Sequence, residues 1–82
     1  MKLHICLGKI IKKEREKLGM TQQDLANRVK RKQNAISLIE SGKRGSHIKL
    51  GFYKELAEVF GLKLYELVAL AEAEQKNKEE GR

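Results

Sequence analysis

Residues 31–45, RKQNAISLIESGKRG, place two amide side chains before an apolar rhythm and two basic side chains after it. Gln33 or Asn34 could form two hydrogen bonds with an adenine, each good pair being worth about 1–3 kcal/mol of discrimination between bases. Lys43 and Arg44 are suited to phosphate groups. The same side chains could also be ordinary solvated residues, so their chemistry depends on the elements that position them.

Positive charge is concentrated around this stretch. The chain of 82 residues has 18 basic and 11 acidic side chains, and its net charge is +7. Residues 28–49 hold seven bases and one acid, which gives +6, whereas residues 50–82 hold five bases and seven acids. Many small proteins are basic, but this clustering favours a polyanionic partner.

Other chemistry finds little support in the sequence. The single Cys6 cannot form an internal disulfide, and His4 and His47 show no metal-ligand spacing. There is no HExxH, paired CxxC, Gly-rich phosphate loop or nucleophile elbow. We therefore expect no enzymatic activity, no metal and no cofactor. Since no apolar run has the length of a signal peptide or membrane span, we expect a cytoplasmic protein.

Apolar residues recur at helical spacing in several segments of the chain. The predicted helices cover about 5–18, a short segment after Thr21, about 32–41, and two segments marked by Leu50 to Phe60 and by Leu64 to Ala71. The end of the chain is wholly polar and is expected to fray. The sequence therefore predicts one all-α domain over residues 1–71 and a frayed or disordered tail over residues 72–82.

The second and third predicted helices are short and close together, as in a helix-turn-helix. With Gln22 as the first residue of this motif, the apolar positions are the fourth, fifth, eighth, fifteenth and eighteenth, namely Leu25, Ala26, Val29, Ile36 and Ile39. The small Ala26 suits the point where the two helices cross. The two isoleucines would seat the second helix on the core.

On these residues the chain resembles the phage-repressor (Xre/Cro-type) helix-turn-helix family. LGMTQQDLANRV, NAISLIESGKR and LAEVFGLKLYELV occur in the family's order and fall within about residues 7–70. The resemblance implies a lambda-repressor-like domain, a compact five-helix bundle whose dimers bind operator DNA. The turn departs from the family pattern, with Lys30 for the usual Gly, Arg31 for an apolar residue and Lys32 for a Ser or Thr cap. Lys30 must then adopt a left-handed backbone, or the turn differs.

The resemblance also implies roles by position. The base-reading positions are Lys32, Gln33, Asn34, Ser37 and Leu38, the last being suited to a thymine methyl group. The phosphate-binding positions are Gln22, Ser41, Lys43 and Arg44.

Two further sets of residues have expected structural roles. Arg15 and Glu40 lie on the inward lines of their helices, where a charge needs a partner, and the family pairs the matching residues. We predict an ion pair that fixes the second helix of the motif, which is the recognition helix in the family, against the first predicted helix. Four residues flank the inward stripes of the last two helices and could join two subunits or pack in the core: Phe52, Val59, Tyr65 and Leu70.

The sequence thus predicts a DNA-binding transcriptional regulator that acts as a homodimer on a near-palindromic operator in double-stranded DNA. One alternative is an antitoxin, or another protein-binding module that also binds DNA, with a toxin protein as partner. Another is a restriction–modification controller protein. RNA binding is less favoured because no stacking aromatic residues lie among the bases.

Overall fold

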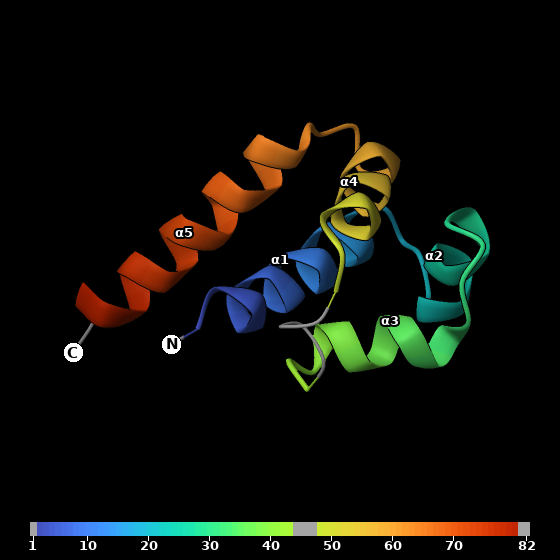
Figure 1. Cartoon of the computed structure of the whole chain (residues 1–82), viewed down its shortest axis with the longest axis horizontal. Coiled ribbons are helices and arrows are strands. Elements are labelled where there is room, and N and C mark those ends of the chain that lie inside the picture. The colour runs from blue at the N-terminus through green and yellow to red at the C-terminus, as the bar shows by residue number, and fades with distance from the viewer. Residues whose placement is uncertain (1, 44–47, 81–82) are drawn as a thin grey trace.

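The computed structural model describes residues 2–43 and 48–80, with side chains described as far as residue 76. This part of the chain forms five helices and no strand (Figure 1). The helices are α1 Leu3–Lys17, α2 Gln22–Arg28, α3 Gln33–Glu40, α4 Leu50–Val59 and α5 Leu64–Glu80. The predicted all-α fold is therefore confirmed, and the first four helices begin and end within about two residues of their predicted positions.

The core draws apolar side chains from all five helices. α1 packs against both α5 and α3, α2 packs against α3, and α4 packs against α5 (Figure 1). The largest side chains with almost no exposed surface are Ile11, Leu25, Ile36, Ile39, Leu56 and Leu67. Because Ile36 and Ile39 are completely buried, one face of α3 is fixed to the core and its opposite face is left outward.

α1 and α3 approach each other closely at Gly8. A Cβ atom at this position would overlap the carbonyl oxygen of Ile39 and would lie 3.3 Å from the Cα of Glu40. The predictions from sequence omit Gly8, although a glycine inside a helix, three residues before the buried Ile11, is a signal of close packing. The absence of a side chain at Gly8 allows α3 to lie this close to α1.

The first four helices end in the same hydrogen-bonded arrangement, in which one residue has a left-handed backbone. In α2 the amide of Lys30 donates to the carbonyl of Asn27 over 3.4 Å, and the amide of Arg31 donates to that of Ala26 over 2.9 Å. Lys30 has φ 57°, whereas the matching residues of the other three helices are Gly19, Gly42 and Gly61. Of the two alternatives for this turn, the chain adopts the left-handed one.

We expect Lys30→Gly to stabilise the protein by about 1 kcal/mol, because a left-handed backbone costs an L-residue about 1–2 kcal/mol and glycine's greater freedom when unfolded offsets part of this. For a domain of this size the unfolding temperature should rise by roughly 4–8 °C. Thermal unfolding followed by circular dichroism measures the shift. Lys30→Ala removes the same charge but keeps Cβ, so it should give no comparable gain, and equal shifts for both variants would contradict this explanation.

The two helices of the motif begin differently. The Thr21 hydroxyl accepts from the Asp24 amide over 3.0 Å, and the Asp24 carboxylate accepts from the Thr21 amide over 2.9 Å, so the two residues form a capping box. This bond from the Thr21 amide lowers the pKa of Asp24 below its ordinary value. Lys32, by contrast, precedes α3 without a side-chain capping bond, as its residue type predicts.

α5 continues through residues 72–80, the segment for which the sequence predicts a frayed or disordered tail. Ala71 is completely buried, and the Glu74 carboxylate lies 3.2 Å from the Lys13 ammonium of α1. The residues of this segment are mainly Ala, Glu, Gln and Lys, all strong helix formers. The polar composition that suggests fraying is thus compatible with a solvated helix.

Candidate nucleic-acid interface

The outward side of α3 begins with the residues predicted to read bases. Lys32, Gln33 and Asn34 are exposed where the helix begins, and Ser37, one turn later, is half-buried. Leu38 is also half-buried, so only part of its side chain is available to contact a thymine methyl group. The structure therefore gathers these side chains on the first two turns of a helix whose other face is held by the core.

The predicted phosphate-binding residues differ in whether their N–H or O–H groups remain available to donate to a phosphate. Gln22 begins α2, and its Nε2 donates to Glu40 Oε1 over 3.1 Å, which leaves the second N–H of this amide for another acceptor. The Ser41 hydroxyl donates to the Leu38 carbonyl over 3.0 Å, so its proton is committed within the protein. Lys43 is exposed after α3, and Arg44 lies outside the described residues.

Arg15 and Glu40 form the ion pair expected from their inward positions. Arg15 Nε lies 2.8 Å from Glu40 Oε2, Nη2 donates to Oε1 over 3.1 Å, and Nη1 donates to the Met20 carbonyl over 2.7 Å. Only 10% of the Arg15 side chain and 3% of the Glu40 side chain are exposed. The bond to Glu40 raises the pKa of Arg15 above its ordinary value. Together with the Gln22 bond, Glu40 links the last turn of α1, the start of α2 and the end of α3.

The four candidate subunit contacts separate into two pairs. Phe52 is only 9% exposed and belongs to the core, and Val59 is half-buried against it, as the core-packing alternative expects. Tyr65 is 68% exposed and Leu70 is 40% exposed. These two line a shallow, mostly apolar groove of about 360 Å³ on α5, together with Leu62, Glu66 and Ala69.

Comparison with known proteins identifies the fold and the family. A family model described as helix-turn-helix matches residues 11–67. A relative from Archaeoglobus fulgidus is 36% identical over 64 residues, which are 78% of this chain and 87% of the relative, and its name is uncharacterized HTH-type transcriptional regulator. The chain belongs to the Xre/Cro-type helix-turn-helix family of DNA-binding transcriptional regulators. α2 and α3 are the two helices of this motif.

Solved structures share the fold of this helix-turn-helix protein. The clp gene regulator ClgR from Corynebacterium glutamicum superposes with a TM-score of 0.83 at 19% identity, over 98% of this chain and 86% of ClgR. A crystal structure of apo-HppE superposes with a TM-score of 0.69 at 22% identity, over 77% of this chain but 34% of HppE. At these identities the likeness is evidence of the fold alone.

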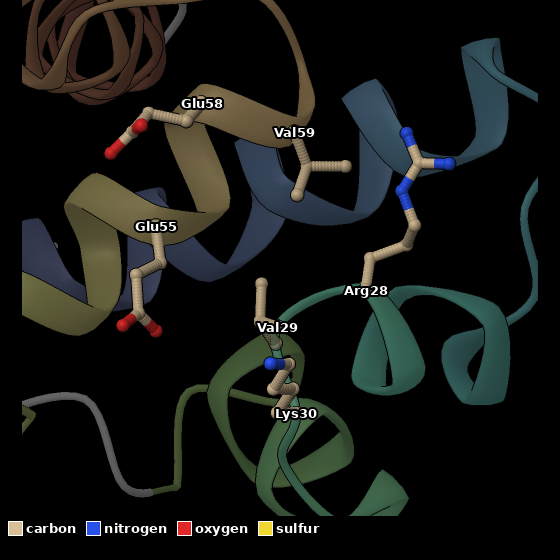
Figure 2. Close-up of a pocket in the computed structure, with 6 residues that line it drawn as sticks. All are labelled: Arg28, Val29, Lys30, Glu55, Glu58 and Val59. Carbon is tan, nitrogen blue, oxygen red and sulfur yellow. The ribbon is translucent and has the colours of Figure 1, made fainter.

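A groove of about 390 Å³ separates the end of α2 from α4 in this helix-turn-helix domain (Figure 2). Val29 and Val59 face one another across it, and the remaining lining residues are Arg28, Lys30, Glu55 and Glu58. The cations come from the motif side and the carboxylates from α4. Because its two sides carry opposite charges, the groove does not favour a polyanion, unlike the outward face of α3.

Arg31 is a residue whose role the sequence patterns do not reveal. Its guanidinium carbon lies 4.9 Å from the centroid of the Phe52 ring, and its Nη2 lies 3.6 Å from Glu55 Oε2. The apolar residue usual at this position of the family is replaced by a cation that still contacts an aromatic ring. Many sequences have an arginine in a turn and, in a later helix, a Phe and a Glu three residues apart. This pattern therefore does not indicate that the side chains meet.

The described helices contain neither a membrane span nor a metal cluster. In the ranges 2–43 and 48–80, no helix combines the length and apolar character needed to cross a bilayer. Among residues 2–43 and 48–76, whose side chains the structure describes, no three or more His, Cys, Asp and Glu side chains lie together as a metal site would require.

Proposed function

We propose that this helix-turn-helix regulator binds a specific, near-palindromic operator in double-stranded DNA as a homodimer. The observation that carries the proposal is the exposed group Lys32, Gln33 and Asn34 at the start of a helix anchored by Ile36 and Ile39. A helix held by one face can enter the major groove with its first residues against the base edges. Amides there suit adenine, and Lys32 suits guanine.

Phosphate contacts would fix the position of the motif on the duplex. The free N–H of Gln22 at the start of α2 and the exposed Lys43 after α3 flank the recognition helix on both sides. Arg44 is included on sequence grounds. The Ser41 hydroxyl already donates to the Leu38 carbonyl, so Ser41 would donate to a phosphate only after that hydrogen bond is broken. Such contacts position the protein but carry no sequence information.

The homodimer is supported by the apolar groove on α5. Tyr65 and Leu70 are large apolar residues left exposed in the protomer, and an isologous contact between two copies would cover both. Two recognition helices of such a dimer would enter successive major grooves about 34 Å apart.

The decisive experiment is selection of bound sequences from random duplex DNA. We expect enrichment of two inverted half-sites whose centres are about 10 base pairs apart. Enrichment of one isolated half-site would contradict the homodimer, and no enrichment at all would contradict sequence-specific binding.

With the selected operator, the assigned roles can be separated by two single substitutions. Gln33→Ala should relax the preference at one base pair of each half-site by about 1–3 kcal/mol. Lys43→Ala should weaken binding to all sequences alike, and the slope of log K against log salt should become shallower by about 0.9 for each phosphate that is no longer neutralised. Titrations at several salt concentrations measure both. The reverse pattern would overturn the assignment.

A further inference from the structure

We propose that Arg31 is a positioning residue, which holds the turn of the motif against α4 and thereby directs the start of the recognition helix. The proposal rests on the proposed DNA-binding function. Arg31 stands directly before Lys32 and Gln33, so any displacement of its backbone is passed to the first residues that would read bases. Its amide is already fixed to the Ala26 carbonyl over 2.9 Å.

The side chain of Arg31 makes the connection to α4. The guanidinium lies over the ring of Phe52, 4.9 Å from its centroid, and reaches the Glu55 carboxylate at 3.6 Å. Phe52 belongs to the core and is 9% exposed, so this ring is a rigid platform. Arginine stacks on aromatic rings and pairs with carboxylates at the same time, which a compact ammonium does less well.

The groove beside the turn explains why such a contact matters. The groove lies between the end of α2 and α4, with Val29 and Val59 facing each other across it (Figure 2). At the groove the two elements are therefore not packed directly on one another. Arg31 spans from the turn to α4 next to this gap, and Lys30, which precedes it, already has the left-handed backbone at φ 57°.

A direct role in phosphate binding is the competing explanation, because Arg31 belongs to the basic segment. The geometry favours the positioning role, since the guanidinium is directed at α4 and its charge faces Glu55. The two roles differ in what a neutral, apolar replacement can do. Leucine can still pack on the Phe52 ring, but it cannot bind a phosphate.

The test compares Arg31→Ala with Arg31→Leu in the full chain, using the selected operator and a random duplex as probes. We expect Arg31→Ala to lower the ratio of operator to random-duplex affinity by about tenfold, comparable to one impaired base contact per dimer. Arg31→Leu should recover most of this ratio, and neither variant should change the salt slope. Arg28→Ala, at the end of α2 on the motif side of the groove, removes the same charge and should leave the ratio unchanged.

Each other outcome has a definite meaning. If Arg31→Leu behaves like Arg31→Ala and the slope falls by about 0.9 per site, Arg31 binds phosphate and the inference is wrong. If Arg31→Ala lowers the unfolding temperature and both affinities in parallel, with the ratio unmoved, its role is only structural. If the unaltered chain selects no operator, the proposed function itself fails, whereas a normal operator with an unaltered ratio in Arg31→Ala refutes this inference alone.

A second variant tests the inference from the α4 side. Glu55→Gln keeps the size of the side chain, removes one negative charge and releases the guanidinium from its partner. A purely electrostatic effect would strengthen binding to every duplex and leave the ratio unchanged. Because the contact with the Phe52 ring is kept and the Arg31–Glu55 pair is largely exposed, the positioning role predicts a fall in the ratio that is smaller than in Arg31→Ala, despite the more positive chain.

Discussion

Glu40→Ala should destabilise the domain by about 3–5 kcal/mol, the usual cost of leaving one charge of a buried pair without its partner. The Arg15 side chain is only 10% exposed and donates two of its hydrogen bonds to this carboxylate. Gln22 loses its acceptor as well. Since small domains are stable by about 5–15 kcal/mol, this is a large part of the total. Urea unfolding monitored by circular dichroism measures the loss.

A matched control is available in the same helix that carries Arg15. Glu14 pairs with Lys17 over 2.9 Å, with 16% of the Glu14 side chain and 71% of the Lys17 side chain exposed. Glu14→Ala leaves the Lys17 charge in solvent, so it should cost about 1 kcal/mol or less. The double replacement Arg15→Met with Glu40→Leu should recover much of the lost stability, because no unpaired charge remains buried. If Glu40→Ala cost no more than Glu14→Ala, the network would not hold the three helices together.

Gly8→Ala should destabilise the protein by about 3 kcal/mol, at the upper end for overpacking, although alanine favours a helix over glycine by about 1 kcal/mol. The added methyl group would overlap the Ile39 carbonyl oxygen, which belongs to the backbone and cannot rotate away. α3 would have to move from α1, so operator affinity should fall even where the variant is fully folded. Urea unfolding and operator titration at low temperature measure the two effects separately.

Gly51→Ala provides the control for the change of residue type. Gly51 lies in the first turn of α4, and a Cβ atom there would meet nothing within 4 Å. This variant should be neutral or more stable by up to about 1 kcal/mol, with unchanged operator affinity. Because helix propensity favours both alanines, similar losses for the two variants would show that the α1–α3 contact does not account for the effect at Gly8.

The order of the helices and most of their inward faces could be predicted because both depend on local periodicity. Ile36 and Ile39 are three residues apart on one face, and a helix with that pattern must bury that face. The Arg15–Glu40 pair was predictable because charges on inward faces need partners and because the family that the sequence resembles pairs the matching residues. The position of Gln33 and Asn34 on the outward face of α3 follows from the same periodicity.

Features that depend on which elements meet in space could not be predicted in this way. Nothing near Arg31 in the sequence indicates that Phe52 lies beneath it, and nothing near Gly8 indicates that Ile39 crosses there. The sequence around Glu74 is polar and resembles a tail. Nothing in it indicates that Lys13 of α1 lies opposite Glu74. Phe52 itself flanks its predicted inward stripe, and its place in the core depends on which elements pack against α4.

The position of Glu40 has a consequence for how errors in recognition would combine. Glu40 is the last residue of α3, the helix that would read bases. Its carboxylate also accepts a hydrogen bond from the side-chain amide of Gln22, which would bind a phosphate. A mismatched base pair that tilts α3 would then pull Gln22 from the DNA strand as well. The penalties at the base and at the phosphate would be cooperative, so discrimination would be sharper than the sum of two independent interactions.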